Sequence, residues 1–302
     1  MLWVLDWFHG KMRKLVRQFL DLILFSNLFM ALCTVAQALV TFKLIGSKPY
    51  YPLLAMLFSS TLFIYNICLF LTKPTDPAKS PLLPKRWFFA HNRLMITITS
   101  ASLIVLMFTY LMLSFKSEVL LVGLGILSVG YTLPIFSKGD QRYGLRNVPG
   151  IKSILIALVW TMSCVLLPIF EAERIHHIII APSDIIILIA KRFLFIIALT
   201  IPFDIRDLFQ DSQSGLKSIP VMFGEKGAYL FCQFLLAGYI VLLFIFKGNG
   251  FNHDFFALGA TTILAGWLIF RSKWEKNEYY YFFYMDGVLI LQYVLLMAFT
   301  FI

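Results

Sequence analysis

Long apolar segments separated by short polar ones dominate the pattern of this chain. Nine windows of about 17 to 25 residues are apolar enough to cross a bilayer as helices. These predicted spans cover residues 19–42, 51–71, 94–114, 119–136, 151–170, 185–203, 228–246, 255–270 and 281–302. The pattern therefore predicts an all-α, polytopic membrane protein in which residues 1–302 form a single transmembrane domain.

Lys and Arg residues gather in every second connection between these spans. The segment before the first span and the loops after spans two, four, six and eight hold 19 of the 26 Lys and Arg residues. Because these residues collect on the cytoplasmic side, we expect the N-terminus inside, the C-terminus outside and the loop after Asp204 in the cytoplasm. The plasma (inner) membrane is the expected location. Residues 1–18 mix aromatic and basic residues, which indicates either an interfacial basic amphipathic segment or an ordinary charged flank.

The overall composition excludes an ordinary soluble globular protein. Hydrophobic residues make up 60% of the chain and charged residues 14%, whereas a soluble domain has about 25% charged residues. The net charge of +10 follows from the basic cytoplasmic loops and suits anionic lipid head groups. No nucleic-acid-binding pattern accompanies it, so the lipid bilayer is the expected partner.

Three aspartates follow the sixth predicted span with helical spacing. Asp204, Asp207 and Asp211 stand at i, i+3 and i+7, which places their carboxylates on one face if the helix continues through them. Clustered carboxylates either take up protons or bind cations, and Mg²⁺ suits hard oxygen ligands and also bridges phosphate oxygens. The spacing therefore predicts a diphosphate-binding Mg²⁺ site at the membrane surface. An acidic loop that merely solvates a helix end is the alternative.

Cations that could complement a diphosphate lie in the loop after the fourth span. This loop runs from Tyr131 and includes Lys138, Arg142, Arg146 and Lys152. Lys152 is the strongest candidate, because a cation at the start of an apolar span is costly unless it has a partner. For each of these residues, the general excess of positive charge in cytoplasmic loops is an equally good explanation.

The region around the three aspartates resembles the second aspartate-rich motif of the UbiA superfamily of intramembrane prenyltransferases. The matching positions are Asp204, Asp207, Asp211, Gly215, Lys217, Ser218, Pro220 and Gly224. Tyr131 and Lys152 are also similar to residues that border the substrate pocket of that family. The resemblance implies a bundle of nine helices around a central cavity, in which a prenyl group passes from an isoprenyl diphosphate to a hydrophobic or aromatic acceptor. It also implies Mg²⁺ bound between two aspartate-rich motifs.

The chain departs from the family at the first of those motifs. The family pattern N-D-x-x-D-x-x-x-D begins here with Asn66, but Ile67, Phe70 and Pro74 stand where the carboxylates would be. Asn66 is then either a pocket residue or a hydrogen-bonding contact between helices. The resemblance therefore implies one metal-binding motif, formed by Asp204, Asp207 and Asp211. Basic residues of the loop after the second span would take the place of the other motif. The expected substrate-binding residues are Asn66, Arg86, Tyr131, Lys152 and Lys217.

Three functions are compatible with this sequence. The first is a prenyltransferase of this family, and the second is a relative that binds an isoprenoid lipid without turning it over. The third is a small-molecule transporter, which is disfavoured because span centres carry few ionisable residues and no matching pair of Gly/Pro-broken helices is found. The intact second motif favours the enzyme, and the degraded first motif opposes it.

Overall fold

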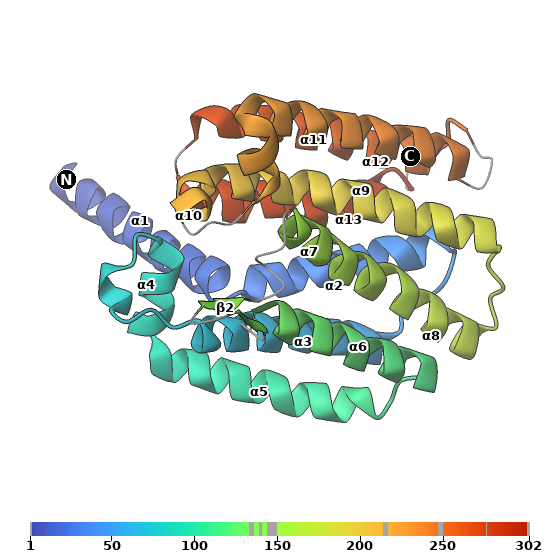
Figure 1. Cartoon of the computed structure of the whole chain (residues 1–302), viewed down its shortest axis with the longest axis horizontal. Coiled ribbons are helices and arrows are strands. Elements are labelled where there is room, and N and C mark those ends of the chain that lie inside the picture. Colours follow the sequence, from blue (N-terminus) through green and yellow to red (C-terminus); the bar gives the residue numbers. More distant parts are fainter. Residues whose placement is uncertain are drawn as a thin grey trace.

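The computed structural model is an all-α bundle whose long helices run side by side (Figure 1). It describes the backbone of residues 2–132, 136–138, 141–143, 150–213, 217–246, 250–275 and 277–300. The α-helices are α1 (Leu2–Phe25), α2 (Leu28–Leu44), α3 (Tyr51–Leu71), α4 (Leu83–Ala90), α5 (Asn92–Tyr110), α6 (Phe115–Thr132), α7 (Ile151–Thr161), α8 (Leu167–His176), α9 (Pro182–Arg206), α10 (Leu208–Gln213), α11 (Ile219–Ile245), α12 (His253–Arg271) and α13 (Asp286–Ala298). The predicted all-α class is confirmed.

Short irregular elements complete the chain. A π-helical segment, Met162–Leu166, joins α7 to α8, and a second one, Tyr280–Met285, leads into α13. The loop between α6 and α7 contains a small antiparallel hairpin of β1 (Phe136–Lys138) and β2 (Gln141–Tyr143), which the sequence pattern did not predict.

Seven helical segments of the described chain are long and apolar enough to cross a membrane. They are Tyr51–Leu71, Asn92–Tyr110, Ile151–His176, Pro182–Arg206, Ile219–Ile245, His253–Trp274 and Tyr280–Ala298. Each overlaps a predicted span. A bent pair of helices in the first predicted span raises the number to eight, and α6, with 18 residues, takes the place of the fourth predicted span. The protein is thus an integral membrane protein, whereas the predicted count of nine spans is not confirmed.

The first predicted span, residues 19–42, is two helices rather than one. The helical axis bends by 61° between Phe25 and Leu28, and Asn27 within the bend has a φ of 66°. Asn adopts this left-handed conformation more readily than most residues, because its short polar side chain can form local hydrogen bonds. Its Nδ2 atom donates to Oδ1 of Asn66 at 2.8 Å. Both halves of the span are apolar, so hydrophobicity alone could not reveal the bend.

Replacing Asn27 by valine is expected to destabilise the protein by about 1–2 kcal/mol more than replacing it by glycine. Both variants lose the hydrogen bond to Asn66, but only valine strains the left-handed backbone. The difference in thermal unfolding between the two variants in detergent measures this strain. Equal unfolding temperatures would show that the bend does not depend on the left-handed residue.

Polar side chains buried between the helices connect α2 to the rest of the bundle. The Nε2 atom of Gln37 donates to the carbonyl oxygen of Leu289 on α13 at 2.7 Å. Arg192 of α9 donates to the carbonyl oxygen of Gln37 at 3.2 Å, and the Thr41 hydroxyl donates to that of Cys164 at 2.6 Å. In a membrane, such interhelical hydrogen bonds replace the hydrophobic driving force that packs soluble helices. α2 is therefore a central helix of the bundle.

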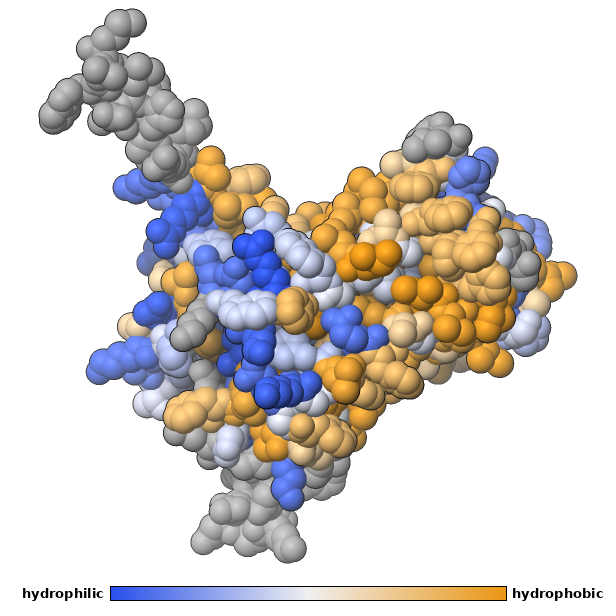
Figure 2. All heavy atoms as spheres, turned by 90° about the horizontal axis from the view of Figure 1, so that it is seen from above, coloured by the Kyte–Doolittle hydropathy of each residue, from blue (hydrophilic) through white to orange (hydrophobic). Residues whose placement is uncertain are grey.

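The surface divides into apolar and polar regions as expected for a protein in lipid. Figure 2 shows hydrophobic residues over much of the visible face and hydrophilic residues gathered toward the end at which α1 lies. Phe108, Leu230 and Phe234 are each more than 70% exposed. In α1, Leu15, Val16 and Phe19 are also exposed. The assignment of residues 1–18 to the membrane interface stays a prediction.

Loops that carry the predicted cytoplasmic charge meet at one end of the bundle. The backbone N–H of Gly150, before α7, donates to the carbonyl oxygen of Lys217, before α11, at 2.7 Å. The backbone N–H of Leu83 donates to Oε1 of Glu278, which precedes α13, at 3.1 Å. Four loops of the alternating set thus share one end. This arrangement agrees with the predicted alternation, and which side of the membrane it faces stays a prediction.

Candidate functional site

Two of the three predicted aspartates meet the predicted lysine. The ammonium nitrogen of Lys152 lies 2.8 Å from Oδ1 of Asp204 and 3.3 Å from Oδ2 of Asp211. Both aspartate side chains are less than 10% exposed, and that of Lys152 is 22% exposed. The hydroxyl of Ser153 donates to the second oxygen of Asp204. We call Lys152, Asp204 and Asp211 the acid–lysine cluster.

The local backbone explains how these three residues converge. Lys152 lies in the first turn of α7, which follows Gly150 in a left-handed conformation with φ 68°. Asp204 lies in the last turn of α9, and Asp211 lies seven residues later in α10. The position of Lys152 at the start of an apolar helix called for a partner, and the two carboxylates supply it.

Asp207 has a different partner. α9 ends at Arg206, so Asp207 stands between α9 and α10. Its Oδ1 and Oδ2 accept hydrogen bonds from Nε and Nη2 of Arg206 at 2.9 and 3.2 Å. Helical backbone hydrogen bonds continue through Asp207, since its N–H donates to Phe203 at 3.0 Å and the Asp211 N–H donates to Asp207 at 2.9 Å. The three aspartates nevertheless pair with different cations, Asp204 and Asp211 with Lys152 and Asp207 with Arg206.

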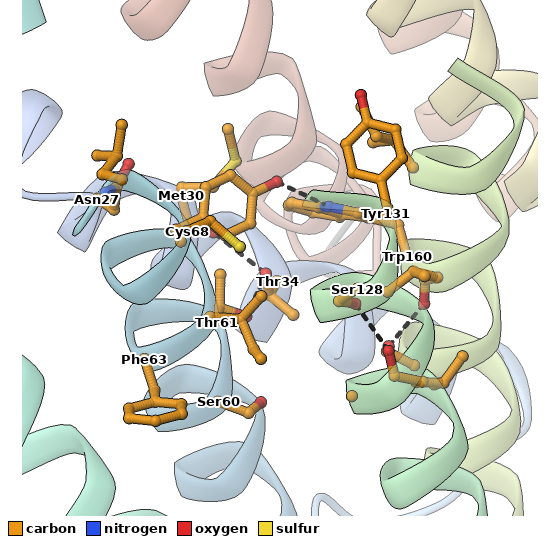
Figure 3. A pocket seen from close by; sticks show the side chains of 18 of the residues that line it. Asn27, Met30, Thr34, Ser60, Thr61, Phe63, Cys68, Ser128, Tyr131 and Trp160 are labelled. Atoms are coloured by element: carbon orange, nitrogen blue, oxygen red, sulfur yellow. Dashed lines mark hydrogen bonds between the residues drawn. The ribbon is translucent and has the colours of Figure 1, made fainter. Parts of the chain in front are cut away.

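A large apolar cavity of about 660 Å³ lies among α2, α3, α6 and α7. Its volume is in the range of small-molecule binding sites. Ser60, Thr61 and Cys68 of α3 face Ser128 and Tyr131 of α6 across it (Figure 3). The indole N–H of Trp160 donates to the hydroxyl of Tyr65 at 3.1 Å within this lining. The cavity therefore offers a mainly hydrocarbon environment with aromatic faces.

Three charged residues line the cavity among the described residues: Lys85, Arg206 and Glu278. All three belong to the end of the bundle at which the loops meet, and we call this charged end of the cavity its mouth. Glu278 is half-buried, and its burial raises the pKa of its carboxyl above the ordinary value, against the lowering effects of the Leu83 N–H and of Arg206. The apolar interior and the charged mouth together suit an amphiphilic ligand.

The remaining predicted site residues are dispersed. Tyr131 lines the cavity, as expected. Asn66 is fully buried and accepts the hydrogen bond from Asn27, but it is not among the residues that line the cavity. Arg86 and Lys217 are exposed at the same end of the bundle. The side chains of Lys138, Arg142 and Arg146, and Gly215 of the motif, lie outside the described residues.

The positions of the degraded first motif hold apolar side chains. The ring of Phe70 packs against those of Phe88 and Phe89, with centroids 5.0 and 6.4 Å apart. The nearby Asp76 pairs with exposed Lys79 at 3.2 Å and does not line the cavity. Along the described part of this loop, no carboxylate is therefore placed to complete a metal site with the acid–lysine cluster.

Sequence reasoning missed Arg206 and Glu278. Arg206 stands between Asp204 and Asp207 in the aspartate motif, and the spacing of the acidic residues gives no role to it. The only available signal was a cation at the end of an apolar span, the same signal that identified Lys152. Glu278 precedes a run of aromatic residues that is typical of a membrane interface, and it gave no signal of its own.

The arrangement of these side chains does not fit a resident Mg²⁺ ion. Carboxylate oxygens are suitable ligands, but the ammonium group of Lys152 lies between Asp204 and Asp211, and Arg206 holds both oxygens of Asp207. Within the described residues, no group of three or more His, Cys, Asp and Glu side chains is placed to hold a metal ion. The assignment of Mg²⁺ to the three aspartates stays a prediction.

Comparison with known proteins gives matches in structure alone. No protein-family model matches the sequence, and no curated protein matches it. A UbiA homologue from Archaeoglobus fulgidus bound to DMAPP and Mg²⁺ has a TM-score of 0.63 at 17% identity, covering 93% of this chain and 99% of that one. The same homologue bound to GPP and Mg²⁺ has a TM-score of 0.63 at 15% identity, covering 93% and 100%.

A third solved structure agrees with these two. A structure of digeranylgeranylglyceryl phosphate synthase has a TM-score of 0.53 at 16% identity, covering 94% of this chain and 96% of that one. Similarity at these identities concerns the path of the backbone, and it extends over nearly the whole length of every chain compared. The chain therefore has the fold of the UbiA homologues.

Proposed function

We propose that this protein is an intramembrane prenyltransferase that transfers a prenyl group from an isoprenyl diphosphate to a hydrophobic or aromatic acceptor. The observation that carries the proposal is the apolar cavity with its charged mouth. Its interior suits an isoprenyl chain, and the mouth suits a diphosphate. Proteins of the same fold have been solved with GPP and DMAPP, which supports the substrate class.

In this proposal the prenyl chain lies along α3, α6 and α7 and the diphosphate lies at the mouth. Transfer breaks the bond between the allylic carbon and the diphosphate oxygen, and pyrophosphate leaves with the bonding electrons. A bond then forms between that carbon and the acceptor, which releases a proton. The aromatic faces of Tyr65, Tyr131 and Trp160 line the cavity and can stabilise positive charge that develops on the allylic carbon.

The acid–lysine cluster lies beside this mouth, at the ends of α7 and α9. Its role in the proposal is to fix the ends of these two helices and to keep a cation, Lys152, near the expected position of the leaving diphosphate. Mg²⁺ neutralises a diphosphate leaving group where it is bound. Lys152 and Arg206 already pair with the described carboxylates of the motif. No step of the proposed reaction is therefore assigned to Mg²⁺.

A second candidate is an isoprenoid-binding protein without turnover. The observation that favours it is the degraded first aspartate motif, in which Phe70 stands at a carboxylate position and packs against Phe88 and Phe89. This candidate uses the same cavity and the same ligand class. It differs from the first only in whether a prenylated product forms.

Filling the cavity from α6 is expected to weaken isoprenoid binding at least tenfold. Gly125 lines the cavity, and a side chain added there meets no atom within 4 Å at its first carbon. Gly125→Phe therefore occupies the space of the prenyl chain without an immediate clash. Gly123→Phe on the same helix is the matched control, because Gly123 is equally open but is not among the cavity-lining residues.

Isothermal titration of the purified protein with a non-hydrolysable geranylgeranyl diphosphate analogue measures this effect. Equal binding by the two glycine variants would contradict the location of the prenyl chain, and absence of binding by the wild type would reject the proposed function. Mass spectrometry of lipid-reconstituted protein incubated with geranylgeranyl diphosphate then separates the two candidates. A prenylated lipid identifies the enzyme, and unchanged diphosphate in the presence of binding identifies the silent relative.

A further inference from the structure

Arg206 lies at the cavity mouth, which it lines together with Lys85. It is the last residue of α9 and lines the cavity directly. Lys152 of the acid–lysine cluster does not line the cavity, and its ammonium group is engaged by two carboxylates. Arg206 is therefore the guanidinium that a ligand in this cavity meets.

Two nitrogen atoms of the Arg206 guanidinium donate hydrogen bonds within the chain, and the third has no acceptor among the described residues. Its Nε and Nη2 atoms donate to the two oxygens of Asp207. Its Nη1 atom is buried and has no hydrogen-bond partner among the described residues. A buried donor without a partner is unfavourable, and an acceptor that reaches Nη1 when the neighbouring side chains shift would satisfy it.

Aromatic rings hold the same group in place. The guanidinium carbon lies 5.4, 5.2 and 5.8 Å from the ring centroids of Phe203, Tyr281 and Phe282. These cation–π distances and the two-pronged contact with Asp207 restrict the guanidinium to one orientation. A planar guanidinium with fixed orientation is well suited to phosphate oxygens.

The other charges at the mouth allow an anion to bind. Lys85 lines the same cavity and adds a positive charge. Glu278 also lines the mouth, but its Oε1 accepts from the backbone N–H of Leu83 at 3.1 Å. Phe70 stands at a carboxylate position of the first aspartate motif and packs against Phe88 and Phe89, so it offers no metal ligand. The protein itself must therefore supply the positive charge.

From these observations we infer that Arg206 binds the diphosphate group of the isoprenyl ligand directly, with Asp207 as its positioning residue, and that this binding requires no divalent metal ion. The inference rests on the proposed function, because it assigns the head-group site of the same ligand. It gives Asp207 a role different from the metal ligand that the sequence resemblance implied.

The test is titration of the full-length protein in detergent with the geranylgeranyl diphosphate analogue, in EDTA and in Mg²⁺. We expect the wild type to bind in both conditions with affinities within about threefold of each other. Arg206→Gln is expected to weaken binding at least tenfold in EDTA, and Arg206→Lys, which keeps the charge without the planar group, to have a smaller effect. Asp207→Asn, which keeps one acceptor for the guanidinium, is expected to weaken binding less than Arg206→Gln.

Arg271→Gln is the matched control. Arg271 lies at the end of α12, stacks over Trp267 at 5.4 Å and pairs with Glu275 at 3.5 Å, but it does not line the cavity. Its replacement should leave binding unchanged. Thermal unfolding of every variant verifies that it is folded, and the EDTA comparison on the wild type stands even if Arg206→Gln does not fold.

The outcomes separate this inference from the proposed function. Wild-type binding that requires Mg²⁺, or wild-type affinity in folded Arg206→Gln, overturns the role of Arg206 while leaving the isoprenoid site in place. Equal affinity for geranylgeraniol and for the diphosphate analogue also overturns it, because the head group is then not recognised. Failure of the wild type to bind either compound overturns the proposed function and the inference together.

Discussion

Replacing Lys152 by methionine is expected to lower the free energy of unfolding by about 3–5 kcal/mol. The substitution keeps a long side chain at the start of α7 but removes the positive charge that lies 2.8 Å from Asp204 and 3.3 Å from Asp211. Two nearly buried carboxylates would then face each other without a counter-ion. Unfolding by denaturant in detergent, followed by circular dichroism, measures the loss.

An exposed lysine provides the control for this prediction. Lys79 pairs with Asp76 at 3.2 Å, but its side chain is 86% exposed. Lys79→Met should therefore cost about 1 kcal/mol or less, as is usual for exposed ion pairs. Adding Asp204→Asn and Asp211→Asn to Lys152→Met should recover part of the lost stability. A Lys152→Met protein as stable as the Lys79→Met protein would show that the cluster does not join α7 to α9 energetically.

The second large effect is expected at the opposite end of the bundle. Glu171 of α8 is fully buried, and its Oε1 accepts from the backbone N–H and hydroxyl of Ser114 and from the hydroxyl of Ser117. Its Oε2 accepts from Arg174 at 2.7 Å. Glu171→Ala removes all these contacts and leaves several donors unpaired. It should cost about 3–5 kcal/mol, given about 1.5–3 kcal/mol for each hydrogen bond to a charged group and incomplete additivity.

Variants at Glu171 and Glu173 define this prediction further. Glu171→Gln keeps the shape and one acceptor, so its cost should be smaller than that of Glu171→Ala. Glu173→Ala is the matched control, because Glu173 is 35% exposed and lies 4.0 Å from Lys116. Similar denaturant midpoints for Glu171→Ala and Glu173→Ala would contradict the prediction that Glu171 fastens the loop between α5 and α6 to α8.

Much of the fold was predictable because hydrophobic length is a strong signal in membrane proteins. Each of the seven membrane-length segments overlaps a window found in the sequence. The bend at Asn27 was not predictable, because it depends on a left-handed residue and on a hydrogen bond to Asn66, 39 positions away. The hairpin of β1 and β2 lies in a loop whose composition predicts no regular structure.

The site was predictable in its charges but not in their pairing. The need of Lys152 for a partner and the spacing of Asp204 and Asp211 both followed from the sequence, and the structure joins the three. Asp207 belongs to the same motif, yet it pairs with Arg206. Spacing along a helix predicts which side chains share a face, but it does not predict which neighbouring cation each carboxylate pairs with.

The buried contacts of α2 have a consequence for the biosynthesis of the chain. Gln37 pairs with Leu289 and Gln292, which lie 252 and 255 residues later. During synthesis, α2 therefore enters the membrane long before the ribosome has made α13, whose residues pair with the Gln37 amide. Until then the Gln37 amide forms hydrogen bonds with lipid head groups, a chaperone or water. The native packing around Gln37 therefore cannot form before α13 has been synthesised.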